Sequence, residues 1–522
     1  MVRRLVSAVI AVMIIGGLAG AALGVSSGSK PRAAATAKAS KPNVVFILTD
    51  DLSWNLINSR WAPHIVGLEK RGETFNHYYV ADSLCCPSRS TILTGLFPHD
   101  TKVLANIGRD GGFKKFQAEH LDRRTFAVAI RRHGYATAMM GKYLNGYGKP
   151  TMTPTTAPVA PGWSDWRVVS NGYQEFNYYM NVNGKVVFYG GPTGRCRVTG
   201  RPNHYGVDVL NSAGRTFIGG RKGKPFVLEV ATFAPHSPYI PAPRNACDFR
   251  GLTEPRDPSF NRASQNPPAW LAHHQKSALN GAETASIDKA YRMRAQSVEA
   301  VDKLLADVEA TLARDHLERN TYIVFSSDNG YHLGQHRLSH GKQTAFETDI
   351  RVPLIIAGPG VPAGKRVPQV VQNVDLYPTF VAITGAMPRK PVDGHSLLSL
   401  LHPRTQRPAW RTVALIEHQH VSRKSPNDPD VEDGVSPTTY EAIRIVSPHL
   451  HAFKGAVNAV YVEYKDAAHE LEFYDLSKDP FELHNTASAL TASQKAQLHK
   501  IVGRLETCHN AQACWSGAVP TR

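Results

Sequence analysis

The stretch Asn43-Val44-Val45-Phe46-Ile47-Leu48-Thr49-Asp50-Asp51 sets the fold class of this 522-residue chain. Its apolar, β-branched run is unbroken from Val44 to Leu48, which is typical of a strand buried on both faces in a parallel sheet. The run ends in two adjacent carboxylates. Because ligands of open α/β sheets bind at the carboxyl ends of the strands, Asp50 and Asp51 are candidates for a functional site. Capping of a following helix would explain one of these carboxylates more easily than both.

Similar runs recur along the chain and alternate with helical patterns. Helices are predicted over 125–133 and 287–312, and in the second of them apolar residues recur every three or four positions. The strand-like runs cover 135–140, 225–231, 321–327 and 352–356. This alternation predicts an α/β fold in which a large mixed, mostly parallel sheet is sandwiched by helices.

One internal segment departs from the alternation. Residues 150–222 are rich in Pro, Gly, Asn and Tyr. We expect a long excursion with small strands rather than core, which either shapes a pocket or decorates the surface.

The C-terminal part has a different pattern. Thr491 and Gln494 form a capping box for a final helix that ends near 505. Before it, short runs at 413–416, 440–446, 459–464 and 472–474 indicate a small antiparallel sheet. With a boundary near 403–409, the predicted organisation is a leader and linker over 1–40, a large domain over 41–408 and a C-terminal subdomain over 409–522.

A second pair of oxygen-bearing side chains follows the run at 321–327. Asp328 and Asn329 can meet the first pair if the two strands are neighbours, and four side chains would then surround one ion. Asp-Asn-Gly also suits a turn, and alone it favours neither interpretation. The two pairs together favour a hard cation with oxygen ligands, Ca²⁺ or alternatively Mg²⁺.

The string Cys85-Cys86-Pro87-Ser88-Arg89-Ser90-Thr91-Ile92-Leu93-Thr94-Gly95 is typical of a helix start. Pro87 suits a first helical position, and the hydroxyl groups after it can serve the free amides of the first turn. Cys85 would then lie where free amides and Arg89 attract an oxyanion. A bare Cys-Cys-Pro is more often a buried or disulfide-bonded pair.

Three further side chains are candidates for the same edge of the sheet. Lys142 follows the run at 135–140, and Lys342 lies in the loop after Asp328. His236 follows 225–231 between two prolines. Histidine suits acid–base catalysis because its ordinary pKa is near neutrality. A lysine after a strand is most often only solvated, and a lone histidine is most often structural. The hypothesis that these residues are functional therefore depends on their position at the carboxyl edge of the sheet.

These strings resemble those of the sulfatases of the alkaline phosphatase superfamily. The matching strings are C-x-P-S-R with S-T-I-L-T-G from Cys85, G-K-Y-L-N from Gly141, A-P-H-S-P from Ala234, S-D-N-G-Y-H-L-G-Q from Ser327 and F-Y-D-L-S-K-D-P from Phe473. The resemblance extends from about residue 43 to 485 and is strongest to N-acetylglucosamine-6-sulfatases and heparan endosulfatases. Leu144 stands where many arylsulfatases have a histidine, so another residue does that work or this subgroup does without it.

The resemblance implies the site residues. Cys85 would be converted by a formylglycine-generating enzyme to an aldehyde whose hydrate is the nucleophile. Arg89, Lys142, His236 and Lys342 would be further catalytic residues, with His236 and Lys342 as proton donors. The implied metal ligands are Asp50, Asp51, Cys85, Asp328 and Asn329.

The expected activity is hydrolysis of a sulfate monoester, on a sulfated sugar or an aryl group. Two alternatives stay open. One is a phosphonate or phosphate ester hydrolase of the same superfamily. The other is a secreted protein that only binds sulfated glycans.

Residues 1–40 predict a secretory leader, because Arg3 and Arg4 precede an apolar run over 5–25 and a Ser/Lys/Ala-rich stretch. An uncleaved membrane anchor is the alternative. We expect a secreted or extracytoplasmic protein without stable membrane insertion after leader removal. The formal charge is +17, of which five positive charges lie in the leader. This basic excess suits sulfated sugars; we expect no nucleic-acid partner, because no basic run interleaved with aromatics occurs.

An exported chain of this kind can pair its cysteines. If Cys85 is modified and Cys86 cannot bridge its neighbour, four cysteines remain. The short spacing of Cys508 and Cys514 makes a local disulfide plausible, which would leave Cys196 and Cys247 as a second pair. The sequence alone leaves other pairings open.

Overall fold

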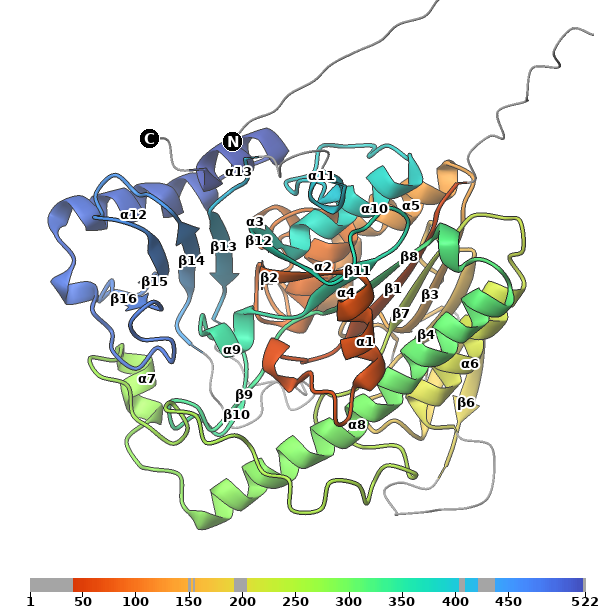
Figure 1. Ribbon diagram of the computed structural model, residues 1–522, viewed down its shortest axis with the longest axis horizontal. Coiled ribbons are helices and arrows are strands. Elements are labelled where there is room, and N and C mark those ends of the chain that lie inside the picture. The colour runs from red at the N-terminus through yellow and green to blue at the C-terminus, as the bar shows by residue number, and fades with distance from the viewer. Residues whose placement is uncertain are drawn as a thin grey trace, which may run out of the picture. The chain divides into compact units, whose positions relative to one another are not determined.

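The computed structural model describes residues 41–148, 152–153, 155–191, 204–402, 409–420 and 437–519. Within them, a ten-stranded sheet runs in the order β12-β2-β11-β8-β1-β7-β3-β4-β5-β6 (Figure 1). Its strands are β1 (Asn43–Thr49), β2 (Glu73–Tyr79), β3 (Ala136–Lys142), β4 (Asp165–Val169), β5 (Tyr178–Val182), β6 (Lys185–Tyr189), β7 (Phe226–Ala231), β8 (Thr321–Ser327), β11 (Leu354–Ala357) and β12 (Lys365–Gln372).

The centre of this sheet is parallel. β1 pairs in parallel with β8 on one side and with β7 on the other, and β7, β3 and β4 continue in parallel. β11 runs antiparallel to both β8 and β2, and β5 and β6 form an antiparallel extension after β4. The predicted large, mixed and mostly parallel sheet is therefore confirmed.

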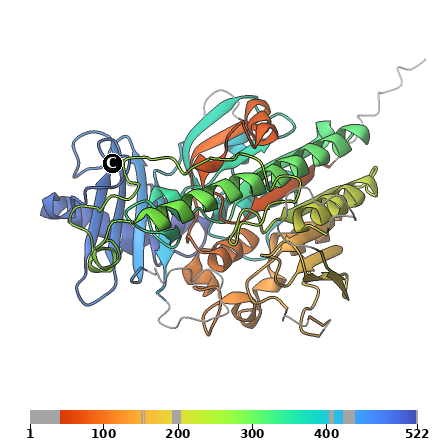
Figure 2. The same cartoon turned by 90° about the horizontal axis from the view of Figure 1, so that it is seen from below.

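Helices cover both faces of the sheet. Successive side chains of β1 point to opposite faces, and each set packs into a separate hydrophobic core. Val45 and Ile47 pack with α1 (Pro63–Arg71), α6 (Gly206–Gly219) and α8 (Gly281–Arg314). Val44 and Phe46 pack on the other side with α2 (Cys85–Thr94), α5 (Phe126–Arg132) and α10 (Leu376–Thr384). The long green helix in Figure 2 is α8. Each fully buried Val, Ile or Phe stabilises the fold by about 1.5–3 kcal/mol.

A second, four-stranded antiparallel sheet follows, as predicted. It has the order β13-β14-β15-β16 and consists of β13 (Val413–His418), β14 (Tyr440–Ser447), β15 (Val457–Tyr464) and β16 (Leu471–Asp475). One face packs against α12 (Ala492–Leu505), whose capping box joins Thr491 and Gln494 as expected. The other face packs against Phe346, against Tyr79 of β2 and against Val370 of β12, so this sheet lies beside one edge of the main sheet.

Within the ranges that the structure describes, the remaining elements are short. They are α3 (Pro98–Thr101), α4 (Gly112–Ala118), α7 (Ala269–His274), β9 (His332–Leu333), β10 (His340–Gly341), α9 (Glu347–Ile350), α11 (Leu398–Leu401) and α13 (Ala511–Ala518), together with five 3₁₀ turns, η1 (Trp54–Leu56), η2 (Leu121–Arg123), η3 (Glu318–Asn320), η4 (Asn373–Asp375) and η5 (Ala487–Ala489). Among the described residues, no helix is both long and apolar enough to span a bilayer.

The prediction for residues 150–222 was wrong in part. β4 extends the main sheet in parallel with β3, and its Trp166 is fully buried in the core. α6 packs on the sheet beside α8 instead of decorating the surface. The polar and aromatic composition concealed both elements, because Trp and Tyr can be buried when their polar atoms find partners. The Trp166 indole N–H donates to the hydroxyl of Tyr147 at 2.8 Å.

The cysteine predictions have different outcomes. The disulfide between Cys508 and Cys514 is present, with the two Cα atoms 5.0 Å apart. Cys247 is disulfide-bonded, whereas Cys196 lies outside the described residues. The predicted leader over 1–40 and the boundary residues 403–408 also lie outside them, so the division into 41–408 and 409–522 stays a prediction.

Candidate active site

Two acidic strand ends meet at the centre of the main sheet. Asp50 and Asp51 follow β1 and Asp328 and Asn329 follow β8, and all four side chains are fully buried. The backbone N–H of Asp51 donates to Asp328 Oδ1 at 3.2 Å. The amide Nδ2 of Asn329 donates to Asp51 Oδ1 at 2.7 Å. The two predicted pairs therefore converge because β1 and β8 are neighbours in the sheet.

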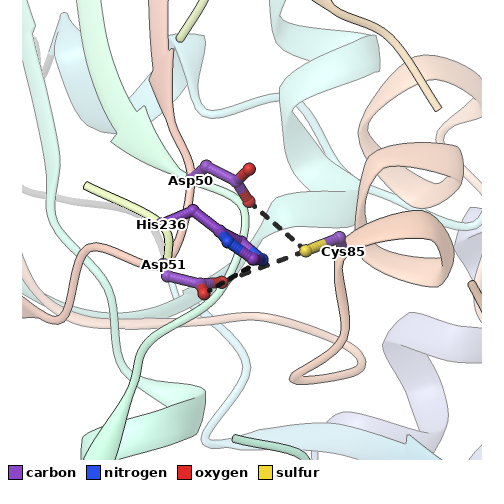
Figure 3. A group of neighbouring side chains, drawn as sticks. All are labelled: Asp50, Asp51, Cys85 and His236. Atoms are coloured by element: carbon purple, nitrogen blue, oxygen red, sulfur yellow. Dashed lines mark hydrogen bonds and ion pairs between the residues drawn. The ribbon is translucent and has the colours of Figure 1, made fainter. Parts of the chain in front are cut away.

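Cys85 faces this centre from the first turn of α2. Its Sγ lies 3.3 Å from Asp50 Oδ1 and 3.9 Å from Asp51 Oδ1 (Figure 3). The helix begins at Cys85, two positions before Pro87. A helix start directs free backbone amides and a partial positive charge at whatever group residue 85 carries.

The hydroxyl groups of α2 do not cap it, contrary to our expectation. The N-cap residue, Leu84, forms no side-chain capping hydrogen bond. The N–H of Cys86 instead donates to Asn106 Oδ1 at 2.8 Å. The Ser88 hydroxyl turns away and donates to the backbone carbonyl of Asp328. This contact ties the first turn of α2 directly to the end of β8.

Arg89 holds several parts of the centre together. Its Nε donates to Asp328 Oδ2 at 2.7 Å and its Nη1 donates to the carbonyl of Lys142 at 2.9 Å. Nη2 lies 3.7 Å from Asp50 Oδ1. The side chain is 2% exposed, so these charge-assisted contacts are shielded from water.

The two lysines contact different carboxylates. The ammonium of Lys142 donates to Asp50 Oδ2, and that of Lys342 lies 2.6 Å from Asp51 Oδ1 and 2.9 Å from Cys85 Sγ. Lys142 is aimed by its neighbour Gly141, which has φ +99° and on which a Cβ would lie 1.9 Å from the carbonyl oxygen of Ala231. Only glycine allows β3 to approach β7 this closely.

His236 presents one ring nitrogen to the centre. Nδ1 lies 2.7 Å from the carbonyl oxygen of Ser237, so this nitrogen carries the hydrogen and donates. Nε2 lies 3.5 Å from Asp51 Oδ2. The ring packs against Tyr173 at a centroid distance of 4.5 Å, which fixes its orientation. In the neutral ring Nε2 is therefore an acceptor, and only in the cationic ring does it carry a second hydrogen directed toward the buried centre.

The charges of the centre are coupled. Burial and the neighbouring Asp328 raise the pKa of Asp50 to about 6, despite Lys142, His236 and Arg89. Burial would also raise the pKa of Asp328, but Arg89, Lys142 and Lys342 hold it well below its ordinary value. Burial opposes charge on Lys142, yet Asp50 and Cys85 raise its pKa well above the ordinary value, so this lysine stays cationic.

The two adjacent cysteines differ in their surroundings. Cys86, the second residue of α2, points into the apolar core, and burial raises the pKa of its thiol to about 12. Cys85 contacts two carboxylates and an ammonium group. The structure thus separates a structural cysteine from a candidate reactive one.

The donor set fits a hard divalent cation. Asp51 Oδ2 and Asn329 Oδ1 are buried oxygens without a hydrogen-bond partner, which is costly unless another group occupies the position. Ligand atoms of Asp50, Asp51, Cys85 and His236 all lie within 4.8 Å of one another (Figure 3). Carboxylate and amide oxygens are the ligands that Ca²⁺ and Mg²⁺ prefer.

Two residues of the centre were missed in the sequence. Arg294 of α8 is 1% exposed, and its guanidinium donates to the carbonyls of Asp51 and Pro235. The sequence feature that could have indicated Arg294 is its position beside the apolar stripe of a long helix. Tyr173 lies under Lys142, with Nζ 5.0 Å from the ring centroid, and its position in the 150–222 excursion concealed it.

The fold and this buried site together place the chain in a known class. The sequence matches the Sulfatase family over residues 42–386 and the C-terminal region of N-sulphoglucosamine sulphohydrolase over residues 334–508. The chain belongs to the sulfatase family and is a sulfuric ester hydrolase.

Individual relatives agree with this assignment. The chain is 31% identical to the N-acetylglucosamine-6-sulfatase of Homo sapiens over 516 residues, which covers 95% of this chain and 88% of that protein. It is 33% identical over 391 residues to the putative extracellular sulfatase Sulf-1 homolog of Caenorhabditis elegans, covering 72% of this chain and 52% of that protein.

Solved structures share the fold. The structure of BT4656 in complex with its substrate D-glucosamine-2-N,6-O-disulfate superposes with a TM-score of 0.73 at 21% identity, covering 92% of this chain and 99% of that one. The phosphonate monoester hydrolase of Agrobacterium radiobacter has a TM-score of 0.62 at 20% identity, covering 87% of this chain and 93% of that one.

Proposed function

We propose that this sulfatase hydrolyses the sulfate monoester of a sulfated sugar, using a formylglycine made from Cys85 and one divalent cation. The observation that carries the proposal is the position of Cys85. Its Sγ lies at the first turn of α2, 3.3 Å from Asp50 Oδ1 and 2.9 Å from Lys342 Nζ.

The cation would be held by Asp50, Asp51, Asp328, Asn329 and residue 85. We favour Ca²⁺, with Mg²⁺ as the alternative, because the four proposed ligands other than residue 85 offer carboxylate or amide oxygens. When bound, the cation would neutralise anionic oxygens of the sulfuryl group. Three buried carboxylates already face three buried cations here, so a divalent ion leaves excess positive charge that suits an anionic substrate.

Residue 85 would be modified by a separate formylglycine-generating enzyme, the expected maturation partner. As an aldehyde hydrate it would supply two hydroxyls on one carbon, one to attack sulfur and one to release the sulfate afterwards. A plain thiol or hydroxyl has no second group for that release.

The remaining side chains would stabilise charge and move a proton. Arg89 and Lys142 keep Asp50 and Asp328 in place and contribute positive potential toward the sulfuryl oxygens. Lys342 contacts residue 85 and Asp51, and His236 Nε2 faces the same centre, so the ammonium of Lys342 or the cationic ring of His236 would protonate the departing sugar oxygen.

A sulfated glucosamine is the substrate class we favour, with 6-O-sulfate as the first ester to test. This follows from the names of the relatives and from the basic charge of the chain. The relatives named as extracellular sulfatases support an extracytoplasmic location.

The proposal is tested with two neighbouring cysteine variants. Cys85→Ala is expected to lose all measurable sulfatase activity because it removes the precursor of the nucleophile. Cys86→Ala, which removes a thiol from the core, is expected to retain most activity at a cost of about 1 kcal/mol in stability. Equal activities of the two variants would contradict the role of Cys85.

The alternatives are separated with the same proteins. Assays with a sulfated glucosamine, an aryl sulfate and an aryl phosphonate rank the ester classes. Faster turnover of the phosphonate would favour the phosphonate hydrolase alternative. Binding of a sulfated glycan without any sulfate release would favour the glycan-binding alternative.

A further inference from the structure

A cavity of about 910 Å³ opens between three segments of the chain. The first is the loop after β7, with Ser237 and Tyr239. The second is the stretch from α7 into the first turns of α8, and the third is the turn between β9 and β10 that carries Arg337 (Figure 1). This volume is in the range of small-molecule sites in proteins.

All three segments also build the catalytic centre. Ser237 follows His236 directly, and His340 of the cavity wall lies two positions before Lys342. On α8, Met293 lines the cavity and the next residue, Arg294, donates to the carbonyl of Asp51. The cavity therefore flanks the centre, and a ligand in it would lie beside a group bound at residue 85.

The walls carry cationic groups. Lys289 is exposed and, in the part of the chain that the structure describes, forms no ion pair. Arg337 approaches from another wall; its Nη1 donates to the carbonyl of Gln275 at 3.0 Å, while its buried Nε has no hydrogen-bond partner. The nearby carboxylate of Glu283 is already engaged, because it accepts the Asn280 N–H in the capping box of α8 at 2.7 Å.

The other lining groups suit a polar ring. Ser277, Ser286 and Ser339 contribute hydroxyls, and His274 and His340 contribute ring nitrogens, whereas Pro238 and Leu279 offer apolar contact. Hydroxyl, cationic and apolar groups in one cavity suit a sugar that carries an anionic substituent.

We propose that this cavity binds an acidic sugar residue adjacent to the one whose sulfate is removed, so that the enzyme recognises a sulfated oligosaccharide rather than a single sugar. This inference depends on the proposed function, since it assigns a second sugar position to the same reaction. Arg337 and Lys289 would bind the sulfate or carboxylate of that neighbouring sugar.

The test uses Arg337→Gln and Lys289→Gln, singly and combined. Lys276→Gln is the matched control, because Lys276 is exposed on the α7–α8 segment and does not line the cavity. Initial rates are measured on a sulfated glucosamine monosaccharide and on a sulfated tetrasaccharide with acidic neighbours.

For the tetrasaccharide, the combined variant is expected to show a KM raised about tenfold with an unchanged kcat, the loss typical of one or two charge-assisted contacts. Its kcat/KM for the monosaccharide should equal that of the wild type and of the control. An equal loss on both substrates would overturn the assignment, since the two residues would then act on the catalytic centre.

Binding separates this inference from the proposed function. The affinity of the tetrasaccharide is measured by calorimetry on Cys85→Ala, with and without the two substitutions. An affinity that the substitutions leave unchanged would overturn the cavity assignment alone. Failure of the wild type to release sulfate from either sugar would overturn the proposed function instead.

Discussion

Among single residues, His236 has a proposed role that depends directly on the contacts of its two ring nitrogens. Its Nδ1 is held by the Ser237 carbonyl and its Nε2 faces Asp51. A general acid in this position increases the rate most for a leaving group of high pKa, because such a group must be protonated as it departs.

We therefore expect His236→Ala to discriminate between leaving groups. Release of sulfate from a sugar alcohol should fall by about 10²–10⁴-fold, the usual range for general acid catalysis. Release from an aryl sulfate with an acidic phenol should fall much less, because that phenoxide leaves without a proton. Steady-state rates on both substrates provide the comparison, and an equal loss on both would contradict the proton-donor role.

At the scale of elements, the close approach of β3 to β7 aims Lys142 at Asp50. Gly141 and Gly134 both have positive φ, at +99° and +88°. A Cβ on Gly141 would collide with the Ala231 carbonyl at 1.9 Å, whereas one on Gly134 would meet nothing within 4 Å. The pair separates the effect of the clash from that of backbone conformation.

Gly134→Ala should cost about 1 kcal/mol through its positive φ alone. Gly141→Ala should lower the free energy of unfolding by several kcal/mol more, since β3 must move away from β7. Thermal unfolding of the two variants checks this. A similar Tm for both would mean that the strand shifts at little cost.

The short helix α3 connects two distant elements through His99. Its Nδ1 lies 2.8 Å from Glu417 Oε1 on β13, and its Nε2 lies 2.8 Å from the carbonyl of Cys508, which is disulfide-bonded to Cys514. Burial alone would lower the pKa of His99, but Glu417, the Cys508 carbonyl and Asp100 raise it to about 9. A His509 ring also lies nearby, at a centroid distance of 5.9 Å.

This contact predicts a pH dependence of stability. Because the folded pKa exceeds the unfolded value of about 6.5, the contribution of His99 is fully present near pH 6 and is lost as the pH rises through 9. The Tm difference between wild type and His99→Gln should therefore be larger at pH 6 than at pH 9.5. A difference that grows with pH would contradict the cationic state of His99.

At the scale of the whole molecule, the sequence predicted the strands with unbroken apolar runs and the chemistry at their ends. The sequence could predict that the two acidic pairs converge only on the condition that β1 and β8 are neighbours, because strand order depends on long-range packing. These pairs are Asp50 with Asp51, and Asp328 with Asn329. β2, with its polar Glu73-Thr74 start and Asn76-His77 centre, gave no such signal. Asn106 and Arg294 stayed hidden for the same reason, since their partners are remote in sequence.

The buried carboxylates predict a response of the whole fold to metal removal. Chelation should abolish activity and lower Tm, because a cation present at a hundred times its Kd stabilises the folded state by about 2.7 kcal/mol. Ca²⁺ should restore both more fully than Mg²⁺. Asp51→Asn is the matched variant, and its Tm should respond little to either treatment. An unchanged Tm and activity of the wild type after chelation would contradict the metal site.

If Cys85 is the precursor of the nucleophile, its conversion changes the mass of the peptide that contains it, and this mass can be measured directly. Peptide mass spectrometry on active protein from its native host should show residue 85 as an aldehyde, lighter than the thiol form and reactive toward a hydrazide, with Cys86 unchanged as a thiol. A plain cysteine at position 85 in fully active protein would show that the enzyme works without a formylglycine nucleophile.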